Sequence, residues 1–252
     1  MAKADCKLCG GTGWTVAEKD GVSSADRCTC IAETRVEDLE NRSQIPSNYQ
    51  RASFDSFTVP HDNPGLERSL KTAMLQVKGY ADNFPFTSGK LGLLLVGPPG
   101  AGKTHLAVAV LRMLISRGYE GVFFDYQNLL DRIRAGYSET LGASSREAYR
   151  FALETDILLL DDLGAHRVTD WVEDTVTAII TYRCNHRKPL IATTNLPDPD
   201  MGGSVVEKSA TPGYRTTLTE RVGERARSRL FEMCRVVNLW GVNDYRLRKP
   251  GS

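Results

Sequence analysis

Short apolar runs alternate with longer mixed stretches over the second part of the chain. The runs are continuous rather than alternating polar and apolar, which favours strands that are buried on both faces. They cover residues 91–96, 121–126, 156–160, 189–194 and 235–240. The helix-compatible stretches between and beside them cover about 104–117, 127–135, 145–153, 170–186 and 217–232. Buried strands separated by helices are typical of an α/β fold whose parallel sheet is flanked by helices.

A glycine-rich turn lies between the first run and the first predicted helix. It fits the complete pattern G-x-x-x-x-G-K-[ST], in which backbone N–H groups and the start of the helix surround phosphate oxygens. We expect Lys103 to reach the β and γ phosphates and the Thr104 hydroxyl to hold Mg²⁺. The alternative is a glycine turn without a ligand. The residues of the loop are Gly97, Pro98, Pro99, Gly100, Ala101, Gly102, Lys103 and Thr104.

Two carboxylates end the third run, in the stretch ILLLDDLG. We expect Asp161 to bind Mg²⁺ through water, because Mg²⁺ keeps much of its hydration shell, and Asp162 to orient or deprotonate the attacking water. Asn195 follows the fourth run and could place its amide near the γ-phosphate. Taken alone, the two acids could cap a strand and Asn195 could be a turn residue. Beside the phosphate loop they predict a nucleoside triphosphatase.

Four stretches occur in an order that resembles the AAA+ ATPases. They read GPPGAGKTHLA, ILLLDDLGA, ATTNLP and LTERVGERARSRLFEMCRVVNLWGVNDYR. More narrowly, about residues 45–248 resemble the DnaC/IstB group, which includes bacterial replicative helicase loaders and transposition helper ATPases. The resemblance implies a five-stranded parallel sheet, an ATP site at a subunit boundary, and self-association through these sites. The usual AAA+ lid would have to follow residue 240, where there is no room for it, and its absence fits this group.

The resemblance also assigns a role to an arginine. In GERARSRL, Arg229 matches the arginine finger that enters a neighbouring subunit's ATP site and stabilises transition-state charge. Arg225 and Arg227 lie in the same stretch and are further candidates. The alternative for Arg229 is a surface ion pair with Glu224 or Glu232.

Two further features bear on ATP turnover. In NDYRLR, Arg246 matches a second sensor arginine, which the resemblance implies would touch phosphate within its own subunit. Many AAA+ proteins end the acidic strand with Asp-Glu, whereas this chain has Asp161-Asp162. The shorter second side chain holds its carboxylate farther back, so we expect slow hydrolysis that suits a switch better than a motor.

Four of the six cysteines lie within the first 30 residues. A reducing compartment favours a metal site over disulfides for such a cluster. Four thiolates suit tetrahedral Zn²⁺ and leave no open position for catalysis, so a structural zinc site is expected, with an iron–sulfur cluster or free thiols as alternatives. With so few apolar residues, this segment would need the metal to fold. The four residues are Cys6, Cys9, Cys28 and Cys30.

The stretch YQNLLDRIRAGYSET carries cations beside an aromatic residue. Arg132, Arg134 and Tyr137 could bind single-stranded DNA, which needs phosphate neutralisation and a stacking face. The alternative is an amphipathic helix whose leucines are buried and whose arginines are solvated. His105 and the tryptophans at 14, 171 and 240 are interpreted as packing residues.

Composition adds limits rather than a function. The formal net charge is +1, although ten Lys or Arg against five Asp or Glu make the chain basic from Met201 onward. No apolar run approaches the roughly 20 residues that span a bilayer, and the N-terminus lacks an apolar signal region. We therefore expect a cytoplasmic protein that makes no use of a membrane.

Together these features predict three regions. Residues 1–32 form a zinc-binding module with four cysteine ligands, 33–90 a helical linker and the start of the ATPase region, and 91–252 the AAA+ core without a full lid. The resemblance implies a helicase loader that binds ATP, a replicative helicase and single-stranded DNA. The alternative is a transposition helper that binds DNA and recruits a transposase. A small-molecule kinase is disfavoured, because the late arginine helix implies an oligomer and no acceptor site is evident.

Overall fold

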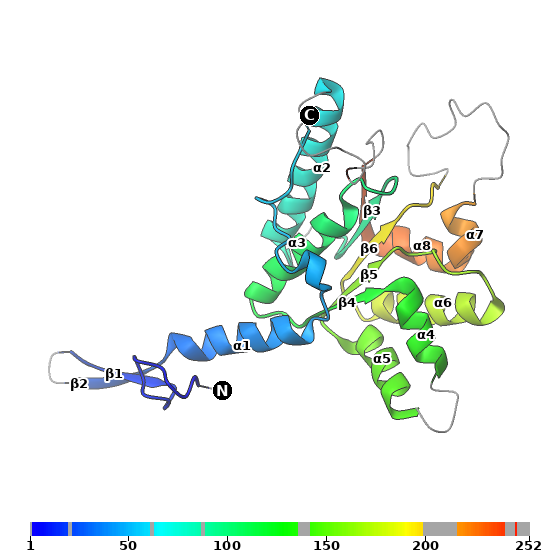
Figure 1. Ribbon diagram of the computed structural model, residues 1–252. Coiled ribbons are helices and arrows are strands. Elements are labelled where there is room, and N and C mark those ends of the chain that lie inside the picture. The colour runs from blue at the N-terminus through cyan, green and yellow to red at the C-terminus, as the bar shows by residue number, and fades with distance from the viewer. Residues whose placement is uncertain are drawn as a thin grey trace.

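In the computed structural model, a parallel sheet lies between two layers of helices, and a Cys-rich module projects from this core on helix α1 (Thr29–Arg42) (Figure 1). The residues that the structure describes are 2–19, 22–60, 63–86, 89–135, 142–198, 216–239 and Tyr245.

The main sheet has the strand order β4-β5-β6-β3-β7, and all neighbouring strands are parallel. The predicted five-stranded parallel sheet is confirmed. Each strand begins and ends within two residues of the run that predicted it. Strands β3 and β6 are neighbours, and β5 lies on the other side of β6, so the carboxyl ends of these three strands meet at one edge. The strands are β3 (Gly92–Val96), β4 (Gly121–Asp125), β5 (Ile157–Asp161), β6 (Leu190–Thr194) and β7 (Cys234–Asn238).

Helices cover both faces of this sheet. On one face lie α2 (Pro64–Asn83) and α3 (Lys103–Ser116), preceded by the short 3-10 helix η1 (Ser47–Tyr49). The other face carries α4 (Tyr126–Ala135), α5 (Gly142–Glu154), α6 (Asp170–Asn185), α7 (Leu218–Val222) and α8 (Glu224–Met233). None of the helices within the described ranges is long and apolar enough to cross a bilayer.

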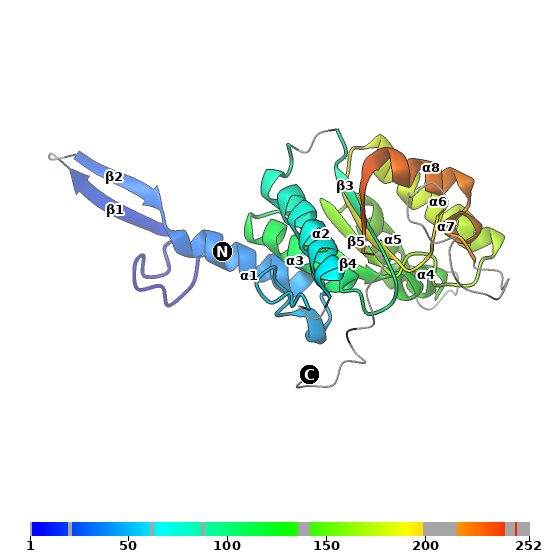
Figure 2. The ribbon, with the colours of Figure 1, turned by 90° about the horizontal axis from the view of Figure 1, so that it is seen from above.

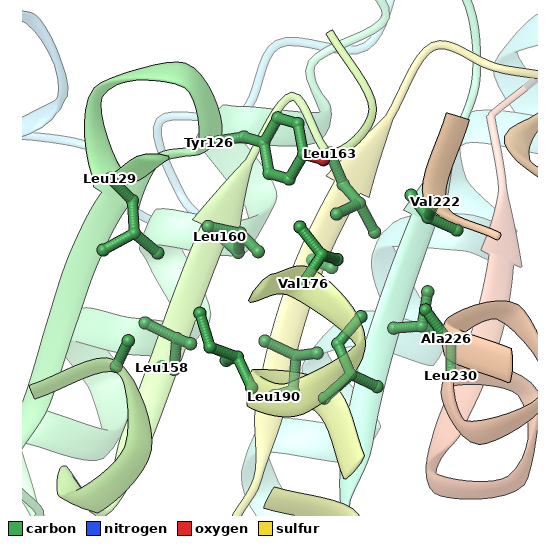
Figure 3. Close-up of a cluster of buried hydrophobic side chains, with 14 of the residues drawn as sticks. Tyr126, Leu129, Leu158, Leu160, Leu163, Val176, Leu190, Val222, Ala226 and Leu230 are labelled. Atoms are coloured by element: carbon green, nitrogen blue, oxygen red, sulfur yellow. The ribbon is translucent and has the colours of Figure 1, made fainter. Parts of the chain in front are cut away.

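Each face of the sheet has its own apolar core, because successive side chains of a strand point to opposite faces. Leu158 and Leu160 of β5 belong to the core under α4–α8, whereas Leu159 belongs to the core under α2 and α3. Figure 3 shows Leu158, Leu160 and Leu190 gathered around Val176 of α6. The strands are therefore buried on both sides, as their continuous apolar sequence predicts.

The single helix predicted over 217–232 is wrong, because the chain breaks there into α7 and α8. The break is at Gly223, whose φ of 81° and ψ of 154° lie outside the helical range. A Cβ at this position would collide with the carboxylate of Glu173 on α6. Glycine thus permits a close approach to α6 and a change of direction just before α8, which carries the candidate finger arginines.

The N-terminal module is an antiparallel hairpin, β1 (Trp14–Lys19) and β2 (Val22–Arg27), carried at the far end of α1 (Figure 2). The other end of α1 is anchored to the core. Glu40 pairs with Arg112 of α3 at 2.9 Å, and the carbonyl of Ser43 accepts a 2.7 Å hydrogen bond from a backbone N–H of β4. The boundary predicted after residue 32 falls inside α1, so the Cys-rich module and the linker share one helix.

Candidate nucleotide and metal sites

The predicted phosphate loop lies between the end of β3 and the start of α3. Gly100 and Gly102 have φ values of 71° and 87°, which glycine adopts without strain. Gly102 also lies against the ring of Phe57, since a Cβ on it would be 2.5 Å from that ring. The loop therefore brings its backbone and the positive end of α3 to one point, an arrangement that binds phosphate.

Lys103 lies inside this loop, with only 5% of its surface exposed. Its ammonium donates hydrogen bonds to the carbonyl of Pro98 at 2.9 Å and to Oδ1 of Asn195 at 2.5 Å. The cation is thus held within the phosphate loop by residues that follow β3 and β6. This is the position from which it can meet phosphate oxygens.

Asp161 is the carboxylate that joins three elements at the edge of the sheet. It accepts hydrogen bonds from Thr104 Oγ1 of α3 at 2.9 Å and from Thr193 Oγ1 of β6 at 2.6 Å. Burial raises the pKa of Asp161, and the hydrogen bonds from Thr193 and Thr104 act against this rise. A hydroxyl and a carboxylate in contact fit the oxygen ligands that Mg²⁺ prefers, so Thr104 and Asp161 would hold the ion beside the phosphates.

Asn195 lies between Lys103 and the second carboxylate. Its Nδ2 donates to Oδ1 of Asp162 at 3.0 Å while its Oδ1 accepts from Lys103. Asp162 itself has a left-handed backbone, φ 53°, and its N–H donates to Thr193 Oγ1 at 2.9 Å. The structure therefore brings the predicted residues of the loop and of both strand ends into one connected network.

A pocket of about 360 Å³ opens beside this network. The phosphate loop, Asp162 and Asn195 line one part of it, and side chains from the segment before β3 line another. Sequence reasoning missed these upstream residues, because they have no motif and no fixed spacing from the loop. They include Tyr49, Phe57, Thr58, Pro60 and Leu70.

The three candidate finger arginines of α8 differ in their surroundings. Arg227 makes two hydrogen bonds to the carboxylate of Asp198, at 2.6 and 2.5 Å, and is therefore held within its own subunit. Arg229 pairs with Glu232 at 2.6 Å, which is the ion pair of the alternative interpretation. Arg225 is exposed and makes no ion pair within the described part of the chain.

None of these arginines lines the phosphate-loop pocket. They line a separate polar groove between α6 and α8. A residue that acts on a neighbour's nucleotide must lie outside its own pocket, so this placement is compatible with a finger. The finger at Arg229 remains a prediction, with Arg225 as its rival.

The second sensor arginine, Arg246, lies outside the described residues. Its neighbour Tyr245 lines the phosphate-loop pocket, and the N–H of Tyr245 donates to the carbonyl of Gly100 at 3.2 Å. The chain therefore returns to the phosphate loop at the residue next to Arg246.

The four N-terminal cysteines converge although 18 residues separate the two pairs in the sequence. Their sulfur atoms all lie within 4.8 Å of one another, with 3.7 Å between Cys6 and Cys28 and 3.6 Å between Cys9 and Cys30. Burial raises the pKa of the Cys9 thiol, but hydrogen bonds from Gly13 and the neighbouring thiols outweigh it and lower the pKa to about 6. The fold brings Cys6 and Cys9 together with Cys28 and Cys30, which lie at the start of α1.

These distances fit a single tetrahedral ion. Zn–S bonds of about 2.3 Å at tetrahedral angles set the sulfur atoms about 3.8 Å apart. A cluster with two or more irons would hold its thiolates farther apart, because the metals and bridging sulfides lie between them. The arrangement of the four cysteines is thus compatible with one zinc, and such an ion would fix the hairpin to the first turn of α1.

The possible DNA surface on α4 is amphipathic. Leu129 and its apolar neighbours are buried, while Arg132 and Arg134 are exposed. Arg132 donates to Gln44 at 2.8 Å and lies over the ring of Phe124, and Arg134 lies over the ring of a tryptophan. Tyr137, the aromatic partner in the DNA interpretation, lies outside the described residues.

The tryptophans do not share one role. Trp171 packs against the core, but interpreting Trp14 as a packing residue was wrong. Trp14 is 49% exposed on the hairpin, where Arg27 lies 5.9 Å from the centre of its ring. A two-stranded hairpin has no second layer to cover its face, so the ring stays in solvent. Trp240 lies outside the described residues.

Fold and site together define a P-loop nucleotide-binding protein of the AAA+ class, and comparison with known proteins narrows this class. The model of the IstB-like ATP binding protein family matches residues 69–210, more than half of the chain. The chain belongs to this family, and it is an ATP-binding AAA+ ATPase related to the DnaC helicase loaders.

Individual relatives come from several settings. The phage-like element PBSX protein XkdC of Bacillus subtilis is 25% identical over 92% of this chain and 80% of its own length. An ATP-binding protein of insertion sequence IS5376 from Geobacillus stearothermophilus is 29% identical over 66% of this chain and 61% of its own length, less than two thirds. The crystal structure of a DnaC helicase loader matches with a TM-score of 0.60 and 31% identity, over 77% of this chain and 99% of that one.

Changing each of the two adjacent carboxylates to its amide should distinguish their roles in ATP binding and hydrolysis. Asp162→Asn should keep ATP affinity within about threefold, because the amide oxygen can still accept from Asn195, and should slow hydrolysis at least about a hundredfold, since an amide is a poor proton acceptor. Asp161→Asn should instead weaken Mg²⁺-dependent ATP binding. Calorimetry and phosphate release measure the two effects.

Asp38→Asn is the control, because Asp38 is an exposed aspartate of α1 and does not line the pocket. It should leave both quantities unchanged. If Asp161→Asn alone stopped turnover while Asp162→Asn turned over normally, the two roles would be reversed.

Purified, reduced protein should contain about one zinc per chain. Cys28→Ser should release this zinc and loosen the hairpin, whereas Cys184→Ser, at a half-buried cysteine outside the cluster, should retain it. Elemental mass spectrometry measures the metal, and proteolysis reports the state of the hairpin. Protein without metal would contradict the zinc site, and protein that contains iron would favour the alternative cluster.

Proposed function

We propose that this protein is an ATP-switched loader that brings a replicative helicase onto single-stranded DNA. The observation that carries the proposal is the pairing of a complete nucleotide site with a Cys-rich module held away from it by α1 (Figures 1 and 2). The similarity to a DnaC helicase loader supports the same function. In this proposal ATP binding makes the subunits assemble and bind DNA. Hydrolysis then releases the DNA and the subunits.

The projecting hairpin is the surface that we assign to the helicase. Trp14 and Val16 point to one face of β1, and Ala25 and Arg27 stand opposite them on β2. Trp14 is 49% exposed and Val16 is 73% exposed. Large apolar side chains that remain in solvent, with an arginine beside a tryptophan, are typical of contact surfaces between proteins.

A pull-down with the replicative helicase from the same source tests this function. Wild-type protein should capture the helicase, and capture should differ with and without ATP. The double variant Trp14→Ser, Val16→Ser should lose at least about nine tenths of the capture, because both side chains would be central to the contact. Thr15→Ala with Ala17→Ser, on the opposite face of the same strand, is the matched control and should capture normally.

Zinc content should be equal in all three proteins, which separates loss of a contact from loss of the folded module. Capture that survives in the double variant would contradict the hairpin as the docking surface. A wild-type protein that captures no helicase would contradict the loader itself.

Single-stranded DNA is the second partner in this proposal. Arg132 and Arg134 are exposed on α4, where their charges could neutralise phosphates. Their contacts with Gln44 and with aromatic rings hold both side chains over the surface of the helix. We propose that this face of α4 contacts the DNA backbone.

We further propose that hydrolysis is Mg²⁺-dependent, slow and completed by an arginine of the neighbouring subunit. Asp162 supplies the shorter carboxylate at the strand end, and Asn195 holds it beside Lys103. The exposed groove between α6 and α8 supplies the candidate arginines to the neighbour. The nucleotide would then control assembly, as a switch requires.

The finger can be identified by mixing inactive variants. Arg229→Ala should bind ATP but hydrolyse it about a thousandfold more slowly, because the lost charge acts on the neighbour's transition state. Mixing it with Lys103→Ala protein should restore some activity, since some interfaces then combine an intact loop with an intact finger. This activity should fall on dilution.

Arg225→Ala should be measured in parallel, and Arg150→Ala, an exposed arginine on α5, is the control that should remain active. If the Arg229→Ala mixture stays inactive although the variants assemble, and the Arg225→Ala mixture recovers, then Arg225 is the finger. Recovery with neither would contradict hydrolysis in trans by α8.

A transposition helper is the second candidate function. The similarity to an ATP-binding protein of an insertion sequence favours it. The same pull-down, repeated with a transposase from the same source, distinguishes the two. Capture of the transposase rather than the helicase would favour this second function.

A further inference from the structure

His105, which follows Thr104 of the phosphate loop, contacts a segment far away in the sequence. Its Nε2 lies 2.9 Å from the carbonyl oxygen of Ser53 and 3.2 Å from Oγ of Ser56. A carbonyl oxygen can only accept, so Nε2 carries the proton and donates to it. The ring of His105 also lies 5.6 Å from the ring of Phe57, centre to centre. A single side chain at the start of α3 thus holds three residues of the upstream segment.

The segment that His105 holds is a compact turn. The N–H of Ser53 donates to Ser56 Oγ at 3.0 Å, and the N–H of Phe57 donates to the carbonyl of Phe54 at 3.3 Å. Further bonds within the turn join the side chains and backbone of Ser53 and Ser56, so short side chains and not a helix or strand form it. The bonds from His105 tie it to the start of α3, and Arg112 of the same helix donates to the neighbouring carbonyl of Ala52 at 3.2 Å.

Holding this turn fixes one wall of the nucleotide pocket. Phe57 lies directly against Gly102 of the phosphate loop, and it lines the pocket together with Tyr49 and Thr58. The phosphates of a nucleotide need only the loop and α3. The base is flat and apolar on its faces, so it needs an aromatic surface such as this wall.

We propose that His105 is a positioning residue that sets the base-binding wall formed by residues 49–58. The proposal rests on the nucleotide site described above. It assigns His105 no part in the chemistry, because its Nε2 is engaged by Ser53 and Ser56 and it contacts neither carboxylate through a described hydrogen bond. Glutamine places an N–H donor at nearly the same distance from the backbone as Nε2 of histidine, whereas leucine fills similar space without a donor.

Two ligands distinguish the contribution of the wall to binding from that of the phosphate loop. MgATP uses both, and inorganic tripolyphosphate with Mg²⁺ uses the loop alone. His105→Leu should lower the affinity for ATP about tenfold, the effect of losing hydrogen bonds that order the wall, and should change the affinity for tripolyphosphate less than about twofold. His105→Gln should restore ATP affinity. In steady-state hydrolysis the loss should raise KM and leave kcat nearly unchanged.

His186→Leu, at an exposed histidine at the end of α6, is the matched control and should bind both ligands as wild type does. An ATP affinity of His105→Leu equal to that of wild type would overturn the proposal. So would an equal loss for both ligands, which would place the effect in the loop, or a failure of His105→Gln to restore binding. Wild-type protein that binds neither ligand would overturn the nucleotide site itself, and this inference with it.

Discussion

The site depends on one buried carboxylate, that of Asp161, and on the two hydroxyls that bind it. Thr104 comes from the helix after the phosphate loop and Thr193 from the strand next to β5. A buried charge needs hydrogen bonds, and here they come from separate elements, so the carboxylate can be satisfied only when the sheet edge is assembled. The parallel order β5-β6-β3 brings the ends of these strands to one edge, and the left-handed Gly102 precedes the helix that carries Thr104. Asn195 then extends the network to Lys103 and Asp162.

Helix α3 connects this edge to the rest of the molecule. Its first residue enters the phosphate loop, and His105 and Arg112, two turns apart, point along one side of the helix. His105 holds the turn at Ser53, while Arg112 donates to the carbonyl of Ala52 at 3.2 Å and pairs with Glu40 at the end of α1. The helix that receives phosphate therefore also holds the base of the helix that carries the Cys-rich module. Contacts through α3 thus join the nucleotide site to the end of α1 that lies against the core.

Much of this could be predicted from the sequence, because the signals are local. Continuous apolar runs gave the five buried strands within two residues, and motif spacing gave the residues of the phosphate loop and both acidic positions. The cysteine spacing likewise identified four thiols that the fold gathers within 4.8 Å.

The remaining features depend on contacts between distant segments. Phe57 reaches the site from a distant turn that contacts His105, and Arg227 is bound to Asp198, a residue 29 positions away. At the break, Gly223 lies so close to the side chain of Glu173 on another helix that no larger residue would fit there without movement. The β1–β2 hairpin was missed because its strands, WTVAEK and VSSADR, contain too few apolar residues to show a pattern. Pairing and the neighbouring cysteine cluster, and not burial of a face, give these strands their structure.

The central claim is that the network of Asp161, Asn195 and Lys103 forms an ATP site. The most direct measurement is calorimetric titration of MgATP into wild-type protein and into Lys103→Ala protein of equal thermal stability. We expect one ATP per chain for the wild type and an affinity at least about a hundredfold lower for the variant, because Lys103 is the cation held inside the phosphate loop. An affinity of the variant within about threefold of the wild-type value would contradict this assignment, because nucleotide binding would then not depend on Lys103.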